Sequence, residues 1–356
     1  MSYAIAPEVF FLVENGKVLL WNCTTHEQYL INQHYFEKIL FISKSGELTS
    51  DRICNDLINA GVIVTKQTSS QHQWGWDILS RLFHSGTKNV LYNQNIENVQ
   101  SYAQNYLVEC EQIKHAIPSF FQEKNTTLIE LPEPNLDFED AKFATVIKKR
   151  KTSRSFYSQS VTVQQLSNLL YAGFGLIHGE WQELSEQGLQ IAGLRKSSPS
   201  SGGLHAEEAY ITAFHIDGLE PGLYYYRPQD HKLNVLKLGN YEDKIIQLNK
   251  NQFYSKGMAF GIYITARLDK YWWKYEHSRS YRIMLLDIGH VSQTFLLSAT
   301  AAGLNTWMTG AFNDSEIEQF LGINGYNESV ILYVGAGYGN SLVFPETFHA
   351  SIDTKK

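Results

Sequence analysis

The sequence has few cysteines, few charged residues and no long uninterrupted apolar run. Of its 356 residues, 3 are cysteine and 19% are charged, while 43% are hydrophobic. Cys23, Cys54 and Cys110 lie far apart and form no CxxC pair or other metal-ligand spacing, which fits a reducing cytosol. The composition also excludes a disordered chain. We therefore expect a folded cytoplasmic protein without a bound metal.

Basic charge is scarce as well. The chain holds 30 Lys and Arg against 36 Asp and Glu, and no basic stretch is long enough to follow a phosphate backbone, so nucleic acid is not an expected partner. The N-terminal segment lacks the basic and apolar regions of a secretory signal. The most apolar stretch, 283–304, is interrupted by Asp287, His290 and Gln293. This pattern is typical of a buried helix and indicates no membrane span.

Aromatic residues are abundant, with 7 Trp, 21 Tyr and 19 Phe. Such an excess fits either an aromatic-rich core or flat surfaces for a flat ligand, and the first is the more common case. The length is sufficient for two or three domains.

Residues 1–85 have the pattern of a small winged-helix-like module. Two apolar runs joined by Glu14-Asn15-Gly16 predict a hairpin. Thr24 followed by Glu27 predicts a capped helix that runs to about Phe41, and a second helix over 51–60 precedes a short strand. The module has six basic and eight acidic residues (Lys17, Lys38, Lys44, Arg52, Lys66, Arg81; Glu8, Glu14, Glu27, Glu37, Glu47, Asp51, Asp56, Asp77). This balance favours a peptide-docking or structural role over DNA binding.

The rest of the chain divides into a connector and a larger domain. Residues 86–142 predict helices followed by an extended, proline-containing segment. From 143 to 350, helices are interleaved with apolar strands, and several strands follow one another directly. One helix is capped by Thr162 with Gln165 behind it, and a long helix covers 281–302. We expect an α+β domain with packed helices.

Two polar segments of this domain indicate ligand binding. Residues 148–154 hold five Lys or Arg and include Arg150, Thr152 and Arg154. Because Arg binds phosphate through paired donors, the spacing favours an anion site over a solvated basic turn. The run 197–205, SSPSSGGLH, has small residues that let backbone amides approach a ligand closely, although an ordinary loop has the same composition.

Two further segments indicate proton transfer and backbone recognition. Lys274-Tyr275 follows two tryptophans, and a lysine among aromatic rings can act as a general base or acid once its pKa is lowered. A second copy, Lys270-Tyr271, lies four residues earlier, so the signal is weak by itself. The stretch 303–312 ends in Gly310-Ala311-Phe312 and can present a backbone N–H to a ligand ring.

Taken together, these segments resemble the FMN-dependent nitroreductase fold, and within it the SagB-type dehydrogenases, the azoline oxidases of ribosomal peptide maturation. The resemblance covers about 145–340. It depends on SPSSGGLH with GLEPGLYYYRP, and on YRIMLLDIGHVSQTFLLSA with AAGLNTWMTGAF, in matching order and spacing. It implies a nitroreductase-like FMN-binding fold over 143–350, with an antiparallel-rich sheet and packed helices, preceded by the winged-helix-like module.

The resemblance also implies how FMN is bound, at the interface of a homodimer. Arg150, Thr152 and Arg154 would hold the phosphate and ribityl chain, with help from Arg282. Gly310 or Ala311 would direct a backbone N–H at flavin N5. A loop from the partner subunit would cover the flavin, formed by Pro199, Ser200, Ser201 and Gly202. Asp287, Gly289, His290 and Gln293 match the interface helix, where we expect packing and helix–helix hydrogen bonds.

The implied reaction is dehydrogenation of a peptide thiazoline or oxazoline to the azole. Lys274 and Tyr275 match the acid/base pair of the azoline oxidases, the flavin accepts the hydride, and oxygen reoxidises the flavin. The N-terminal module would hold the leader part of the peptide substrate or a partner enzyme such as a cyclodehydratase.

Two departures from the family pattern keep alternatives open. No Lys or Arg follows the 334–339 turn until Lys355, where many nitroreductases have a basic residue. The spacing from Lys274-Tyr275 to Arg282 is about one residue long, so Lys270-Tyr271 competes as the catalytic pair. The alternative functions are an NAD(P)H-dependent nitro or quinone reductase, a dehydrogenase of another peptide or carrier-bound amino acid, and a non-enzymatic scaffold in a peptide-modifying complex.

Overall fold

The computed structural model describes residues 2–66, 74–90, 97–112, 118–136, 138, 141–179, 193–340 and 346–353. Contacts divide the chain into two compact units. The first comprises Met1–Gln94 with His277–Arg279, and the second comprises Asn95–Glu276 with Ser280–Lys356.

The first unit contains the expected hairpin and two strands that the sequence did not predict, β1 (Tyr3–Ile5) and β4 (Glu27–Ile31). Strands β2 (Val9–Glu14) and β3 (Lys17–Asn22) pair across a turn in which Asn15 and Gly16 both have positive φ. The predicted start of the first helix at Thr24 is wrong, because residues Glu27–Ile31 form β4 and pair with β3, and the helix begins only at Gln33. Helix α1 (Gln33–Ser45) begins after Asn32, whose side chain accepts hydrogen bonds from two backbone amides of the first turn.

The first unit has a small hydrophobic core of its own. Helix α2 (Arg52–Asn59) is capped by Asp51, and β5 (Ile63–Thr65) pairs with β1 (Tyr3–Ile5). Helix α4 (Ile78–Gly86) follows. The buried apolar side chains come from the central strand, both helices and β5 (Leu20, Ile39, Ile42, Cys54, Leu57, Val62, Ile63).

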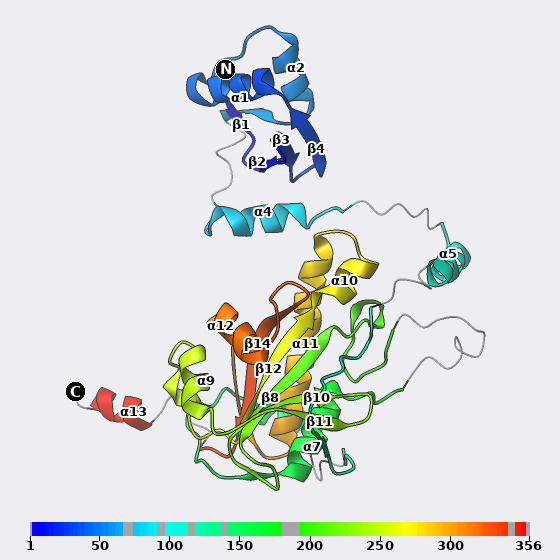
Figure 1. Cartoon of the computed structure of the whole chain (residues 1–356). Helices are drawn as coiled ribbons and strands as arrows, with labels where there is room; N and C mark the ends of the chain where they lie inside the picture. The colour runs from blue at the N-terminus through cyan, green and yellow to red at the C-terminus, as the bar shows by residue number, and fades with distance from the viewer. Residues whose placement is uncertain are drawn as a thin grey trace. The chain divides into compact units, whose positions relative to one another are not determined.

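The second unit is built on a seven-stranded sheet in which every neighbouring pair of strands is antiparallel. Figure 1 shows β14, β12, β8, β10 and β11 side by side. The order across the sheet is β13 (Asn305–Thr309), β14 (Glu328–Gly337), β12 (Phe260–Arg267), β8 (Glu207–Ala213), β10 (Gly222–Arg227), β11 (Lys232–Leu238) and β6 (Leu128–Glu130). The predicted α+β class with an antiparallel-rich sheet is confirmed.

Helices cover both faces of this sheet. On one face, α7 (Val163–Phe174) and α11 (Arg279–Ala301) contribute to the larger core, and on the other, α9 (Glu242–Leu248) and α12 (Asp314–Leu321) contribute to a second core. As predicted, Thr162 and Gln165 form the capping box of α7. Since both faces are covered, all residues of β8, β10 and β12 are buried. The other elements are α5 (Val99–Gln112), α6 (Phe143–Lys149), β7 (Val161–Thr162), β9 (Ile216–Asp217), α10 (Leu268–Lys274) and α13 (Glu346–Asp353).

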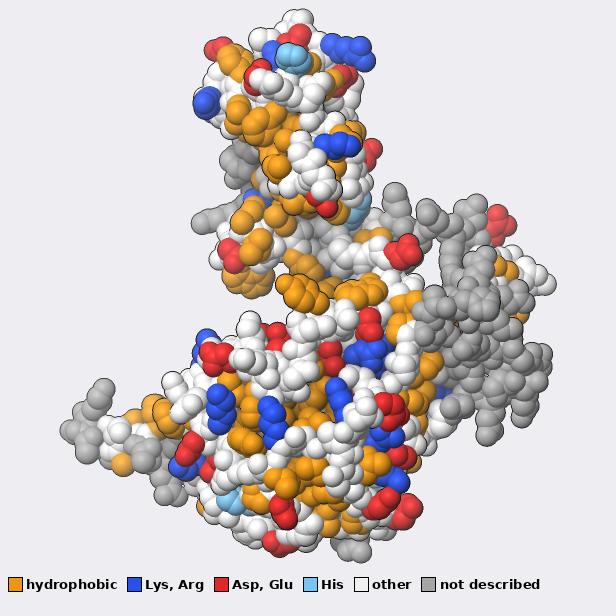
Figure 2. All heavy atoms as spheres, in the orientation of Figure 1, with side chains coloured by type: hydrophobic (Ala, Val, Ile, Leu, Met, Phe, Trp, Pro, Cys, Tyr) orange, Lys and Arg blue, Asp and Glu red, His pale blue; other side chains and the backbone are white. Residues whose placement is uncertain are grey.

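The surface carries both signs of charge. Basic and acidic side chains are interspersed over the face of the second unit that Figure 2 shows. Within the described part of the chain, no helix has the length and apolar character needed to cross a membrane.

We expect Gly261→Ala to destabilise the second unit by several kcal/mol, because a Cβ there would lie 1.9 Å from Tyr333 Oη and 2.2 Å from its Cζ. Tyr333 is fully buried and bonded to Thr212, so its ring has no space to move. Thermal or urea unfolding measures the loss. Gly173→Ala is the matched control, since its new Cβ would meet Phe295 at an ordinary 3.7 Å. Equal stability of the two variants would contradict this account of the packing.

Candidate functional site

The sheet register brings the 197–205 loop to Lys274-Tyr275. Strand β8 runs antiparallel to β12, so the start of β8 lies beside the end of β12, with Glu207 opposite Ala266. The loop leads into β8, and α10 follows β12 directly. The Arg267 N–H donates to Ala206 O at 2.8 Å and fixes this junction. Two segments that are about 70 residues apart in sequence therefore meet at one end of the sheet.

Lys274 and Tyr275 converge on Gly202. Lys274 Nζ donates to Gly202 O at 3.3 Å and lies 5.9 Å from the centre of the Tyr275 ring. Gly202 has φ +60°, and a Cβ at this position would lie 2.6 Å from Tyr275 Oη and 2.7 Å from Lys274 Nζ. Both side chains are half-buried. The absence of a Cβ at Gly202 thus leaves the space that the amine and the phenol occupy.

The other Lys-Tyr copy lies in the interior. Lys270 and Tyr271 are each 3% exposed. Lys270 Nζ donates to His205 O at 3.1 Å and lies 3.5 Å from Glu208 Oε1. Burial lowers the pKa of Lys270 and raises the pKa of Tyr271 far above its usual range, to which the hydrogen bond from Tyr271 to Asp287 adds. Of the two copies, Lys274-Tyr275 is therefore the one with side chains exposed to solvent in part.

The glycine-rich loop is tied to α11 of its own chain. Ser200 Oγ and the Ser201 N–H each donate to Asp287 Oδ2 at 2.8 Å, while Pro199 is exposed. Asp287 thus bonds to this loop and to Tyr271 of α10. Gly289, His290 and Gln293 are exposed on α11.

The cationic segment follows the edge strand β13. Thr152 forms a parallel bridge with Thr306, and the Ser153 N–H donates to Thr306 O at 2.8 Å. Arg150 ends α6, and the Arg154 guanidinium lies 5.5 Å from the Tyr254 ring. The three predicted side chains, Arg150, Thr152 and Arg154, are half-buried along one short segment.

Gly310 and Ala311 follow the end of β13 and are exposed. The Ala311 N–H donates to Thr309 Oγ1 at 3.0 Å, which leaves the N–H of Gly310 as the candidate for a ligand ring. Gln252 holds this turn by donating to Ala311 O at 2.7 Å. Arg282 is exposed near the start of α11.

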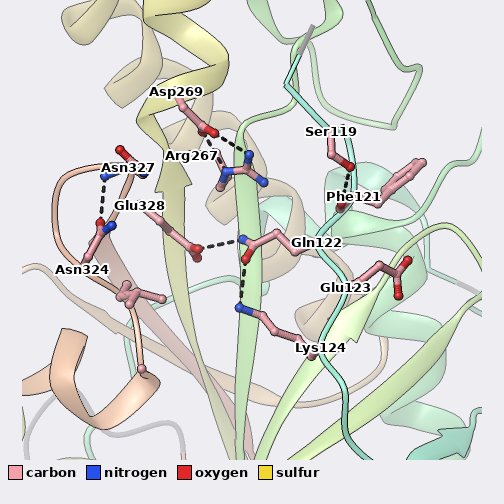
Figure 3. Close-up of a pocket in the computed structure, with 12 residues that line it drawn as sticks. Ser119, Phe121, Gln122, Glu123, Lys124, Arg267, Asp269, Asn324, Asn327 and Glu328 are labelled. Carbon is pink, nitrogen blue, oxygen red and sulfur yellow. Dashed lines mark hydrogen bonds and ion pairs between the residues drawn. The ribbon is translucent and has the colours of Figure 1, made fainter.

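Sequence reasoning missed a recess of about 740 Å³ at the same end of the sheet. Figure 3 shows Gln122 reaching Glu328, and Arg267 paired with Asp269. Glu328 is 5% exposed, and burial together with the charge of Glu208 raises its pKa. Acidic residues at the starts of apolar strands were the signal that could have revealed this cluster. Among the described residues, no group of three His, Cys, Asp or Glu side chains could hold a metal ion.

The sequence profile of the nitroreductase family matches residues 147–338, more than half of the chain. The chain therefore belongs to the nitroreductase family and is a flavin-type oxidoreductase of that superfamily. Its predicted phosphate segment, glycine-rich loop and Lys-Tyr pair all lie within the matched residues.

Several curated relatives are similar to this chain. MJ1384 of Methanocaldococcus jannaschii, a nitroreductase by name, is 29% identical over 202 residues, which cover 57% of this chain and 93% of the relative. Trifolitoxin-processing protein TfxB of Rhizobium leguminosarum is 30% identical over 142 residues, 39% of this chain and 38% of its own length. Trifolitoxin operon protein TfxC of the same organism is 23% identical over 283 residues, 74% of this chain and 75% of its own.

A solved structure agrees with the fold. A protein of Anabaena variabilis that also has nitroreductase in its name superposes with a TM-score of 0.54 at 22% identity, covering 76% of this chain and 50% of that one. At this identity the likeness supports the fold alone.

We expect Gly202→Ala to disturb Lys274 and Tyr275 selectively. The new Cβ would collide with both side chains, and its positive φ costs about 1–2 kcal/mol for any other L-residue. The rate at which Lys274 is acetylated, read by mass spectrometry, should change.

Gly179→Ala is the matched control, because Gly179 has φ +64° with nothing within 4 Å of its Cβ position. It should lose similar stability without a change at Lys274. Identical Lys274 labelling in both variants would refute the contact at Gly202.

Proposed function

We propose that this chain is an FMN-dependent oxidase of the SagB type, which dehydrogenates a peptide thiazoline or oxazoline to the azole. Membership of the nitroreductase family supports flavin chemistry. The relatives TfxB and TfxC, named for trifolitoxin, support a role in peptide natural-product maturation. The observation that carries the proposal is the convergence of Lys274 and Tyr275 on Gly202.

The residues along β13 fit FMN. Arg150 and Arg154 supply cations and Thr152 a hydroxyl on one short segment, as a phosphate and a polyol chain require. Gly310 lacks a Cβ, and the nearest atom to a Cβ there would be Leu332 Cδ1 at 3.9 Å, so a flat ring can approach its backbone. FMN, when bound, supplies the acceptor for the hydride that leaves the azoline.

The protein's own part in the reaction is to position the ring and remove a proton. Aromatisation requires the loss of one proton and one hydride from the azoline. Lys274 as the amine, or Tyr275 as the phenolate, takes the carbon-bound proton. Their location beside an exposed glycine-rich backbone leaves room for a substrate ring, and half-burial limits the water around the base.

A homodimer would complete the site. Within one chain, Ser200–Gly202 bond to α10 and α11, whereas the Arg150 segment follows β13. A second copy would bring the loop of one subunit to the Arg150 segment of the other. The outer side of α11 supports such a contact, because Tyr281, Leu285 and Leu286 are exposed there.

The N-terminal unit is proposed to hold the leader part of the peptide substrate. Strand β4 is at the edge of its sheet, and a recess of about 330 Å³ lies between it and α2, lined in part by Tyr29, Ile31 and Leu57. An extended peptide can pair with such an edge while its side chains enter the recess.

A reductase that takes electrons from NAD(P)H is the second candidate, and the similarity to MJ1384 over 93% of that relative favours it. The two functions differ in how the bound flavin is reduced. Rapid bleaching of the flavin absorbance by NADPH would favour the reductase, and bleaching by an azoline peptide alone would favour the oxidase.

We expect Arg150→Ala and Arg154→Ala each to weaken FMN binding about 10- to 100-fold. A hydrogen bond to a charged group contributes about 1.5–3 kcal/mol, and each tenfold change in affinity corresponds to about 1.4 kcal/mol. Titration of the apoprotein with FMN, followed by flavin fluorescence, measures the change. Lys149→Ala, an exposed neighbour, is the control and should bind normally. Unchanged affinity in both arginine variants would exclude this phosphate site.

We expect Lys274→Ala and Tyr275→Phe to lower azoline turnover about 10²–10⁴-fold while FMN remains bound, which is the usual contribution of a general base. Mass spectrometry of the peptide gives turnover, and the flavin spectrum gives occupancy. Lys244→Ala, at an exposed position of α9, is the control. Full turnover in both variants would rule out the assigned acid/base pair.

A further inference from the structure

Asp287 is a buried carboxylate that joins three separate elements. It lies in the middle of α11 and is 5% exposed. Its Oδ2 atom accepts hydrogen bonds from Ser200 Oγ and the Ser201 N–H, both at 2.8 Å, and from Tyr271 Oη. One oxygen therefore holds the glycine-rich loop and α10 against α11.

The donors around this oxygen are neutral. Among the described residues, no ion pair involves Asp287, and a backbone amide and two hydroxyls donate to its buried carboxyl group. A buried carboxylate is costly unless it is hydrogen-bonded in this way. The three hydrogen bonds thus offset the cost of burying this carboxyl group.

Both groups held by Asp287 lead directly to the candidate acid/base pair. Ser201 precedes Gly202, whose carbonyl accepts the hydrogen bond from Lys274. Tyr271 lies one helical turn before Tyr275, whose N–H donates to Tyr271 O at 2.8 Å. A shift of either element relative to α11 would move Lys274 away from Gly202.

We infer that Asp287 is a positioning residue, which sets the placement of Lys274 and Tyr275 by clamping the Ser200–Gly202 loop and Tyr271 to α11. The inference rests on the proposed function in one respect. Asp287 affects catalysis because Lys274 or Tyr275, which it positions, is the proposed base. The clamp itself is a property of the chain and can be tested without substrate.

Asp287→Asn is the primary test, because it keeps the size of the side chain. An amide that presents its oxygen is a weaker, neutral acceptor, and one that presents its NH2 group places donors against donors. We expect hydrogen exchange in a peptide covering 197–204 to accelerate at least tenfold at Ser201. The pH profile of Lys274 acetylation should shift, while that of the exposed Lys256 stays unchanged.

Asp51→Asn is the matched control. Asp51 also accepts three hydrogen bonds, from a backbone amide, a hydroxyl and the Lys38 ammonium, but it caps α2 in the other unit. It should leave exchange at Ser201 and labelling of Lys274 unchanged. If Asp287→Asn does not fold, Tyr271→Phe and Ser200→Ala each remove one donor and keep the carboxylate, and both should accelerate exchange at Ser201 more than Asp51→Asn does.

Turnover separates this inference from the proposed function. With an azoline peptide, Asp287→Asn should lower kcat at least tenfold and change KM little, because the base is displaced and the peptide-binding unit is intact. Exchange and labelling that match Asp51→Asn would overturn the clamp even in an active oxidase. Wild-type protein that oxidises no azoline would overturn the proposed function, while a changed exchange rate would still support the clamp.

Discussion

Antiparallel pairing of β8 with β12, from Phe260 opposite Ala213 to Ala266 opposite Glu207, is the constraint on which the candidate site depends. It places the loop that enters β8 beside the helix that leaves β12. Because both strands are buried on both faces, their register cannot slip without exposing the cores of the unit. The loop and the helix are therefore held at one end of the sheet whatever the details of their own sequence.

Burial gives the two Lys-Tyr copies on α10 different roles. Residues four apart lie on the same side of a helix, so the sequence leaves 270–271 and 274–275 equivalent. In the structure, Lys270 and Tyr271 bond inward to His205 and Asp287, while the second pair reaches the loop at Gly202. The inner copy is buried, and the outer one is half-buried beside the glycine-rich loop.

Short sequence patterns predicted secondary structure well where residues close together in the sequence determine it. The capping box at Thr162, the turn at Asn15-Gly16 and the long helix before β13 are confirmed. The same capping pattern at Thr24 was misleading, because Tyr29 and Ile31 gain contacts by pairing with β3. Pairing between segments depends on the whole unit, and no short pattern contains that information. For the same reason the sequence did not predict that Gln122, Arg267 and Glu328 line one recess.

The sequence by itself predicted the α+β class of the fold, because periodicity and caps are written along the chain, and the order of its motifs indicated the nitroreductase family. Only the tertiary structure decided which of these residues meet. It brought Lys274 and Tyr275 to Gly202, buried their duplicate, and joined Asp287 to the glycine-rich loop. These outcomes depend on strand register and on the cost of burying charge, and both arise only when distant segments pack.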